Sequence, residues 1–289
     1  MIIPDNRNNT VAFQGEIGAF SHQVCSATFP SMEVLPCASF HDVIAAVESY
    51  KADCAVLPIE NSIYGRIADM HKILRTSQLF IIGEYFLPIC LNLIAAHGRK
   101  TSDITEACSH PVALGQCKNF LKQYNIKPVE AVDTAGAARQ LSESPNKNRG
   151  VIAPELAAKV YGLSILNSNI EDASHNTTRF LFMARKILEL EQNKDVITTI
   201  IFQTRNIPSA LYKTLGGFAT NGINIVKLES YMIETGFYSA QFYVDIEGNP
   251  ACKNMQLAID EAKFFSSNLK IIGVYPKHKF RSEWSQSSS

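Results

Sequence analysis

The longer, N-terminal part of the chain, up to about residue 186, alternates short apolar runs with longer amphipathic stretches. The apolar runs predict buried strands and the amphipathic stretches predict helices, which is the order of βαβ units around a largely parallel sheet. We expect strands at residues 11–14, 55–59, 79–83, 89–95, 150–153 and 179–184, and helices at residues 18–28, 40–50, 67–75, 111–124, 134–141 and 154–161. The pattern predicts an α/β unit, and it leaves open whether this unit is one sheet or two lobes with a cleft between them.

A second, self-contained pattern follows the charged residues 187–194, which we interpret as a linker. Its order is βαββαβ, the order of a ferredoxin-like unit. The strands are expected at residues 196–203, 223–233, 237–246 and 270–275, the first helix after Pro208, the second around residues 255–265, and a turn at Glu234-Thr235-Gly236. The polar, serine-rich tail at residues 277–289 is expected to be frayed.

Composition narrows the range of partners. With 289 residues and 46% apolar content, the chain can bury one large core and a smaller one. Basic and acidic residues balance at 27 each, and no basic run is interleaved with aromatics, so neither nucleic acid nor a membrane surface is an expected partner. The polar N-terminal ten residues and the odd number of cysteines, without a Cys-x-x-Cys pair, predict a cytoplasmic protein with reduced thiols.

Three short polar clusters lie where apolar strand-like runs stop. They are Glu60-Asn61-Ser62, Ser109-His110-Pro111 and Thr178-Arg179-Phe180. Open α/β sheets bind ligands at the carboxyl ends of their strands, and these clusters offer hydroxyl, amide and guanidinium donors that suit carboxylate oxygens. Together the clusters predict an anion-binding cleft with a small organic acid as its ligand.

Each cluster also has an ordinary structural explanation. Asparagine and serine are typical turn residues, and Ser109 can cap the helix that begins two residues later. Arg179 can grip a carboxylate through two parallel hydrogen bonds, or it can form a surface ion pair with Glu171 or Asp172. Taken singly, the clusters do not decide between a binding site and a structural role.

The sequence lacks the signatures of several other chemistries. The glycines at Gly15, Gly18, Gly216 and Gly217 do not have the spacing of a dinucleotide or phosphate-binding loop. The histidines show no His-x-x-x-His spacing, and no Gly-x-Ser-x-Gly segment is present. We therefore expect chemistry that uses hydrogen bonds and charge placement, with no cofactor and no metal.

Six segments, in this order and spacing, resemble the monofunctional bacterial prephenate dehydratase family. They are Phe13-Gln14-Gly15 through Gly18-Ala19-Phe20-Ser21, Pro58-Ile59-Glu60-Asn61-Ser62 with Gly65, Ser109-His110-Pro111 with Gln116-Cys117, Asp133-Thr134-Ala135 with Ala137-Ala138, Ala157-Ala158 with Tyr161-Gly162-Leu163, and Asn176 with Thr178-Arg179-Phe180. The resemblance implies a two-lobed catalytic domain over residues 10–186, similar to periplasmic binding proteins. Because no chorismate mutase-like segment precedes residue 11, we expect the form that is not fused to such a domain.

The resemblance also implies the reaction and its residues. The reaction is the decarboxylating dehydration of prephenate to phenylpyruvate in L-phenylalanine biosynthesis. The leaving hydroxyl would be hydrogen-bonded by Thr178 or protonated by Glu60, if burial beside its apolar strand keeps that carboxyl protonated. The catalytic set is Thr178, Glu60, Asn61 and Gln116, and the substrate-binding set is Ser21, Asn61, Ser62, Ser109, Gln116, Thr177 and Arg179.

The βαββαβ unit, over residues 195–276, resembles an ACT domain, which in this family binds phenylalanine at a subunit interface. Its signatures are altered: Ser209-Ala210-Leu211-Tyr212 replaces Gly-Ala-Leu-Val, and Glu229-Ser230-Tyr231-Met232 replaces Glu-Ser-Arg-Pro. We expect a homo-oligomer, a dimer or a tetramer, with L-phenylalanine as its allosteric effector. The expected effector-binding residues are Ala210, Leu211, Asn224, Leu228, Glu229 and Ser230.

Two other functions fit the same residues. The first is dehydration of arogenate, whose side chain bears an amine where prephenate has a ketone. The second is a carboxylate-binding or amino-acid-sensing protein without turnover. Product formation separates an enzyme from a binding protein, and a comparison of the two substrates separates the two dehydratases.

Overall fold

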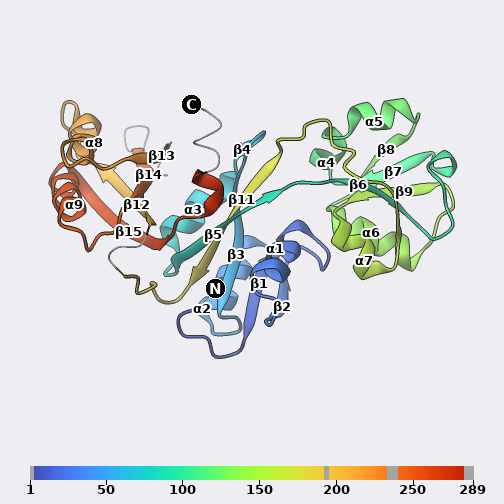
Figure 1. Cartoon of the computed structure of the whole chain (residues 1–289), viewed down its shortest axis with the longest axis horizontal. Helices are drawn as coiled ribbons and strands as arrows, with labels where there is room; N and C mark the ends of the chain where they lie inside the picture. The colour runs from blue at the N-terminus through green and yellow to red at the C-terminus, as the bar shows by residue number, and fades with distance from the viewer. Residues whose placement is uncertain (1–2, 192–194, 233–239, 283–289) are drawn as a thin grey trace.

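The computed structural model describes residues 3–191, 195–232 and 240–282, and two β-sheets organise these residues (Figure 1). One sheet has ten strands and the other has five. The α/β unit is therefore two lobes with a sheet each, and the C-terminal unit extends the sheet of the first lobe.

The first lobe is built on parallel strands with helices between them. The strands are β1 (Thr10–Gln14), β2 (Glu33–Cys37) and β3 (Cys54–Asn61), with α1 (Phe20–Thr28), α2 (Phe40–Glu48) and α3 (Ala68–Thr76). Two further long strands, β5 (Phe80–Pro88) and β11 (Thr177–Ala184), and the short β4 (Gly65–Arg66) complete it. Because β11 runs antiparallel to β3, the first residues of β11 lie beside the last residues of β3.

The second lobe holds the five-stranded sheet in the order β10-β6-β9-β7-β8. Its strands are β6 (Asn92–Ala95), β7 (Glu106–Ser109), β8 (Lys127–Glu130), β9 (Arg149–Ala153) and β10 (Ser164–Asn167). Its helices are the short 3-10 helix Thr101–Asp103, α4 (Pro111–Gly115), α5 (Lys118–Gln123), α6 (Thr134–Glu143) and α7 (Glu155–Tyr161). The single helix predicted at residues 111–124 is wrong, because the chain leaves helical geometry at Cys117 and divides it into α4 and α5.

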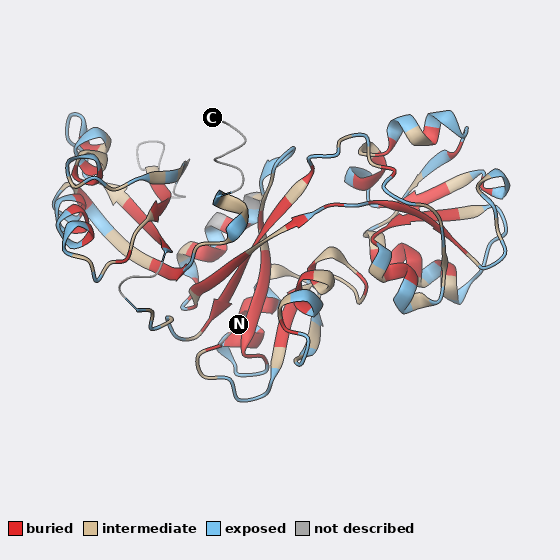
Figure 2. Cartoon of the chain, viewed as in Figure 1, coloured by how far each residue is buried: buried red, intermediate tan, exposed pale blue. Residues whose placement is uncertain are grey.

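Two neighbouring chain segments connect the lobes. The outgoing segment follows β5 and the returning segment precedes β11, and they hydrogen-bond through Ile89 N to Asn176 O at 2.8 Å and Ile170 N to Leu91 O at 2.9 Å. A core cluster continues across this connection, from Phe13 and Phe182 in the first lobe to Leu93 and Leu114 in the second. In Figure 2 the middle of each sheet is buried and the helices face solvent on their outer sides.

The C-terminal unit has the predicted βαββαβ order. Its elements are β12 (Val196–Thr204), α8 (Ala210–Thr220), β13 (Ile225–Met232), β14 (Ala240–Glu247), α9 (Lys253–Phe265) and β15 (Ser266–Pro276). The strand order β13-β14-β12-β15 is ferredoxin-like. The predicted turn at Glu234-Thr235-Gly236 lies outside the described residues.

The C-terminal sheet joins the first lobe where β15 pairs with β5, at Gly273 and Ile81. A Cβ atom built on Gly273 would lie 2.5 Å from Ile81 Cβ and 2.7 Å from Ile81 O. Only glycine allows this approach of the two backbones. The two predicted domains are therefore joined by one continuous sheet as well as by the linker.

The prediction of a frayed tail is wrong for residues 277–282. These residues include a helical turn at residues 279–282 that packs on the first lobe. Phe280 stacks on Phe86 with ring centroids 4.7 Å apart, and Arg281 forms an ion pair with Glu84 at 2.7 Å. Aromatic stacking and a charged pair thus order the residues that composition alone marked as a polar tail.

Candidate active site

The first and third sequence clusters meet at the junction of β3 and β11. Thr178 lies opposite Asn61 in the strand register, and Asn61 Nδ2 donates a hydrogen bond to Thr178 Oγ1 at 3.0 Å. Asn61 Oδ1 accepts from the backbone N–H groups of Ile63 and Tyr64, both at 3.0 Å. These two bonds fix which end of the Asn61 amide carries the NH2 group, so Thr178 receives a donor.

Ser62 and Thr177 form a second set of hydrogen bonds between the same strands. The backbone of Thr177 donates to Ser62 Oγ at 2.9 Å, and Ser62 Oγ donates to the carbonyl of His175, also at 2.9 Å. The serine hydroxyl is therefore used to hold the start of β11 against the end of β3. The predicted residues Asn61, Ser62, Thr177 and Thr178 are brought together here.

Asn176 adds a buried amide to this group, and no role was predicted for this residue from the sequence. Its side-chain oxygen accepts from Asn61 Nδ2 at 2.7 Å, and the residue is 2% exposed. Its Nδ2 has no hydrogen-bond partner within the described structure. An unpaired buried amide donor costs roughly 1–3 kcal/mol, and an acceptor on a bound ligand would satisfy it. The available signal was its place two residues before Thr178.

Arg179 points away from Thr178, because successive side chains on a strand lie on opposite faces. It is 2% exposed, and Nη1 lies 2.7 Å from Asp245 Oδ2 while Nε donates to Glu84 at 2.9 Å. The predicted alternative of a surface ion pair with Glu171 or Asp172 is wrong. Those two carboxylates accept from the backbone N–H groups of Leu91 and Asn119 instead.

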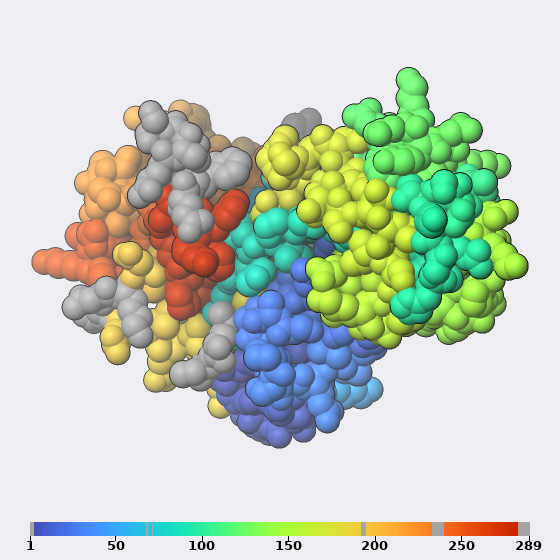
Figure 3. Space-filling model, turned by 45° about the vertical axis from the view of Figure 1, so that its right-hand side comes forward, coloured from blue at the N-terminus to red at the C-terminus, as the bar shows by residue number. Residues whose placement is uncertain are grey.

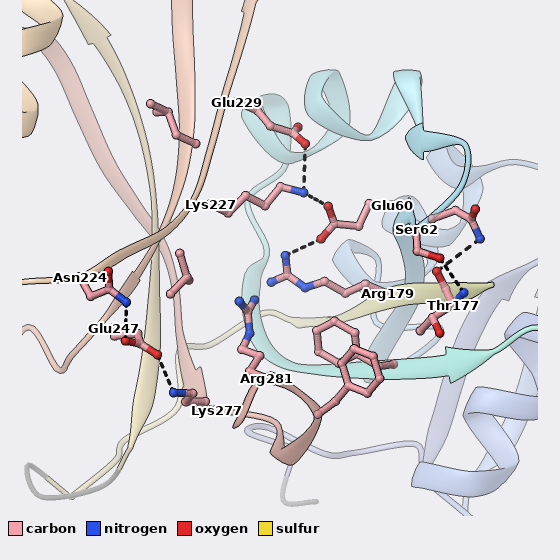
Figure 4. Close-up of a pocket in the computed structure, with 15 residues that line it drawn as sticks. Glu60, Ser62, Thr177, Arg179, Asn224, Lys227, Glu229, Glu247, Lys277 and Arg281 are labelled. Atoms are coloured by element: carbon pink, nitrogen blue, oxygen red, sulfur yellow. Dashed lines mark hydrogen bonds and ion pairs between the residues drawn. The ribbon is translucent and has the colours of Figure 1, made fainter. Parts of the chain in front are cut away.

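Glu60 lies on the same face as Arg179. Its carboxylate accepts from Arg179 Nη1 at 3.0 Å and also pairs with Lys227 of β13, while the side chain remains 29% exposed (Figure 4). The expectation that Glu60 is buried in apolar surroundings is therefore wrong, because two cations contact its carboxylate. Neither Glu60 nor Arg179 is hydrogen-bonded to the Asn61–Thr178 pair in the described part of the chain.

The second cluster lies in the other lobe, at the carboxyl end of β7. Ser109 is fully buried and donates to the carbonyl of Ile152 at 2.6 Å. The prediction that it caps the next helix is wrong, because His110 is the N-cap and its Nδ1 accepts from the backbone of Val112 at 3.2 Å. Gln116 ends α4, and its carbonyl accepts from the backbone of Asp172 at 2.6 Å. Among the described residues, no hydrogen bond joins Ser109 or Gln116 to Asn61 or Thr178.

The lobes nevertheless touch where the loop at the carboxyl end of β1 meets helix α7. The loop after β1 touches α7, where Tyr161 Oη donates to Ile17 O at 2.7 Å. A Cβ atom on Gly18 would lie 3.0 Å from Ala157 Cα, so the approach is close. Ser21 follows this loop in the first turn of α1 and is 8% exposed. Figure 3 shows the blue N-terminal lobe against the yellow-green segment of α6 and α7.

A cavity of about 800 Å³ lies between the first lobe and the C-terminal unit (Figure 4). On the lobe side its lining includes five predicted site residues, namely Glu60, Asn61, Ser62, Thr177 and Arg179. On the C-terminal side it includes three of the six predicted effector residues, namely Asn224, Leu228 and Glu229. The cavity thus joins the β3–β11 junction to strand β13.

The other predicted effector residues lie elsewhere. Ala210 is buried at the start of α8, and Leu211 packs against the core of the C-terminal unit. Ser230 of β13 is exposed, and its carbonyl accepts from Arg66 at 3.2 Å. The structure therefore does not gather the six residues into one site within a single chain.

No group of three or more His, Cys, Asp or Glu side chains in residues 3–191, 195–232 and 240–282 is placed to hold a metal ion. Within the same ranges, no helix has the length and apolar character needed to cross a membrane.

The protein is of the mixed α/β class. It has two α/β lobes joined by paired connecting segments, and a ferredoxin-like unit extends the sheet of the first lobe. A family model described as Prephenate dehydratase matches residues 11–187. The bifunctional N-acyl-homoserine lactone acylase/prephenate dehydratase of Komagataeibacter europaeus is 42% identical over 277 residues, covering 96% of this chain and 99% of that protein. Arogenate dehydratase 2 of Petunia hybrida is 36% identical over 280 residues, covering 92% of this chain and 71% of that protein.

The fold agrees with a solved structure. The crystal structure of prephenate dehydratase from Arthrobacter aurescens in complex with L-Phe matches with a TM-score of 0.83 and 26% sequence identity, over 96% of this chain and 98% of that one. The chain belongs to the prephenate dehydratase family, which is a family of enzymes. The resemblance drawn from the six sequence segments is confirmed at the level of the family.

Proposed function

We propose that the protein converts prephenate to phenylpyruvate, and the observation that carries this proposal is the Asn61–Thr178 hydrogen bond in a chain of this family. The reaction breaks the C–C bond to the ring carboxylate and the C–O bond to the ring hydroxyl. The electron pair of the C–C bond completes the aromatic ring. Carbon dioxide leaves, and the hydroxyl leaves as water after taking up a proton.

Thr178 is the group proposed to act on the leaving hydroxyl. Because its oxygen already accepts a hydrogen bond from Asn61, its own hydrogen is available to a substrate oxygen. A threonine hydroxyl is too weak an acid to give up its proton completely at neutral pH. It therefore stabilises the charge that develops on the leaving oxygen, and solvent completes the proton transfer.

The buried NH2 group of Asn176 supplies a second donor beside Thr178. It is the unpaired donor of this group, and a carboxylate or hydroxyl oxygen of the substrate would satisfy it. In this proposal Asn61 orients both neighbours, because its Nδ2 bonds to Asn176 Oδ1 and to Thr178 Oγ1. A preorganised set of donors of this kind favours a transition state in which oxygen gains charge.

The second lobe supplies the remaining contacts of the proposed site. By the family resemblance, Ser109 and Gln116 hold the substrate from the carboxyl edge of the five-stranded sheet, and Ser21 holds it from α1. The contact of Tyr161 with Ile17 supports this placement, because it joins the loop at the carboxyl end of β1 to the second lobe. Prephenate carries two carboxylates and a hydroxyl, so donors from two lobes can orient it.

Regulation by L-phenylalanine is proposed for the C-terminal unit as an ACT domain. Its ferredoxin-like order and the L-Phe complex of the Arthrobacter aurescens relative support this assignment. An effector shifts activity only if it binds one arrangement of the domains better than another. Within the proposal, the enzyme is a homo-oligomer, either a dimer or a tetramer, whose C-terminal units bind the effector between them.

Two second activities are each favoured by one observation. Arogenate dehydration is favoured by the 36% identity to the Petunia hybrida protein, and acylase activity on N-acyl-homoserine lactones by the 42% identity to the Komagataeibacter europaeus protein. The active-site residues proposed above act on a leaving hydroxyl, which both prephenate and arogenate contain. Dehydration is therefore preferred to acylase activity, and prephenate is the first candidate substrate because the matching family model is that of prephenate dehydratase.

The test is a comparison of substrates with the full-length protein. The protein is incubated with prephenate, arogenate and an N-acyl-homoserine lactone, and kcat/KM is measured for each with and without L-phenylalanine. We expect phenylpyruvate from prephenate with the highest kcat/KM. If the protein turned over another substrate but formed no product from prephenate, this result would contradict the proposed function.

A further inference from the structure

The two strands that carry the Asn61–Thr178 pair are held on their opposite face by the C-terminal unit. A charged residue adjoins each member of this pair. Glu60 precedes Asn61 on β3, and Arg179 follows Thr178 on β11. These two residues also lie opposite each other in the strand register. Side-chain alternation then puts the catalytic pair on one face of the strands and the ion pair on the other.

Each of the three nitrogens of the Arg179 guanidinium donates a hydrogen bond. Within the first lobe, Nε donates to Glu84 at 2.9 Å and Nη1 donates to Glu60 at 3.0 Å. From the C-terminal unit, Asp245 Oδ2 lies 2.7 Å from Nη1, and Tyr275 Oη accepts from Nη2 at 3.0 Å. One planar group therefore spans both units, and all three of its nitrogens are bound to protein groups in this arrangement.

The partners of Arg179 are themselves fixed. The side chains of Glu84 and Asp245 are completely buried, and Arg281 pairs with both, at 2.7 Å and 3.2 Å. Asp245 Oδ1 accepts from Thr199 Oγ1 at 2.7 Å. Two arginines and two carboxylates thus balance in charge, and a shift of one partner leaves a buried charge uncompensated.

The same C-terminal sheet reaches β3 by a second route. Lys227 of β13 pairs with Glu60, and it also contacts Glu229 at 3.0 Å (Figure 4). The C-terminal groups that hold Glu60 and Arg179 therefore come from β13, β14 and β15, three strands of the C-terminal unit. A movement of that unit relative to the rest of the first lobe reaches both strands of the catalytic pair.

We propose that Arg179 is a positioning residue, which sets the geometry of Thr178 through its ion pair with Asp245 and so couples the C-terminal unit to turnover. This inference rests on the proposed dehydratase function. It assigns Arg179 and Glu60 to the link between domains instead of to substrate. Displacing a reacting group by 1 Å costs on the order of 10²-fold in rate, so a small movement of β11 is enough.

The experiment compares variants on the C-terminal side of this link, none of which changes a residue of β3 or β11. Tyr275→Phe removes the hydroxyl that accepts from Arg179, and Asp245→Asn removes the charge of the partner. The matched control is Lys270→Gln, because Lys270 also bonds across the domains, to the carbonyl of Ser77 at 3.3 Å, but its contact is with the end of α3. The measurements are kcat, KM for prephenate, and inhibition by L-phenylalanine, with circular dichroism to check the fold.

We expect Asp245→Asn to lower kcat by roughly 10-fold or more, with KM within about 3-fold of the parent. Tyr275→Phe should lower kcat by a smaller factor, and Lys270→Gln should leave it unchanged. The concentration of L-phenylalanine for half inhibition should rise by about 5-fold or more in Asp245→Asn, since coupling of this kind is worth at least that much.

A folded Asp245→Asn or Tyr275→Phe enzyme with the kcat and inhibition of the parent would overturn the inference, even if it melts at a lower temperature. If Asp245→Asn does not fold, the kcat and the inhibition of Tyr275→Phe test the inference alone. This variant loses only one buried hydroxyl and is therefore expected to fold. Failure of the parent to consume prephenate would instead reject the proposed function. The two failures are thereby distinct.

Discussion

Asn61 donates a hydrogen bond to Thr178 across the β3–β11 pair, so the two residues are neighbours in space although 117 positions separate them in sequence. The bond leaves the hydroxyl hydrogen of Thr178 free for a substrate. It also ties the end of one strand to the start of another that returns from the second lobe. The geometry of the site thus depends on how the two lobes are connected.

The first prediction concerns the hydroxyl of Thr178. Thr178→Ala removes a donor to the leaving oxygen and should lower kcat by about 10² to 10³-fold, the usual loss for one such donor. Thr178→Ser keeps the hydroxyl and should retain most of the activity, and phenylpyruvate formation measures both. Equal activities of the two variants would remove this hydroxyl from the mechanism.

The second prediction concerns the unpaired amide of Asn176. Asn176→Asp keeps the oxygen that accepts from Asn61 but replaces the buried NH2 group with a carboxylate oxygen. A negative charge there repels a dianionic substrate, so KM for prephenate should rise about 10-fold or more. Steady-state kinetics checks this, and an unchanged KM would show that the amide does not face the substrate.

The third prediction is a loss of stability in acid. Burial alone would raise the pKa of Asp245, but Arg179 and Arg281 outweigh it and lower the pKa to about 2, from an ordinary value of 3.8. The stabilisation is therefore complete above about pH 4 and is lost as the pH falls through about 2. It amounts to about 2 kcal/mol.

Urea unfolding of the parent and of Asp245→Asn between pH 7 and pH 2 measures this contribution. The parent should lose more free energy of unfolding between pH 4 and pH 2 than the variant loses. Parallel curves for the two proteins over that interval would mean that Asp245 does not titrate as described.

The fourth prediction concerns the joint between β15 and β5. Gly273→Ala puts a methyl group against Ile81 and should destabilise the protein by about 2 kcal/mol, lowering Tm by roughly 4 °C or more. Gly216→Ala is the matched control, because a Cβ at that position of α8 meets no atom within 4 Å. Alanine also favours a helix, so the control should melt at the same or a slightly higher temperature. Equal effects of both changes on Tm would argue against the close approach of the strands.

Strands with strong apolar runs were predictable, and the polar ones were not. The runs at β1, β3 and β11 gave strands within two residues of their observed bounds, whereas the strand predicted at residues 79–83 continues to Pro88 in β5. The predictions omitted β2, β8 and β10, which are edge strands without a buried residue. They also omitted the short β7, which has only two apolar residues, Ala107 and Cys108. An edge strand buries too little surface to leave an apolar pattern in the sequence.

The site was predictable where residues lie at the ends of the same strands, and not where partners come from another domain. The cluster at residues 60–62 and the cluster at residues 177–180 meet because β3 and β11 are neighbours. Strand alternation in the sequence already separates the faces of Thr178 and Arg179. The ion-pair partner of Arg179 is Asp245, which lies in a different domain. No local sequence pattern predicts this ion pair.

The central claim is that Asn61 and Thr178 act as one unit in the dehydration of prephenate. The most direct measurement is a double-mutant cycle on kcat with Asn61→Ala, Thr178→Val and the double variant. If Asn61 works by orienting Thr178, the double variant should be hardly slower than Thr178→Val alone. Losses that simply multiply, or single variants that keep the parental kcat, would contradict the account.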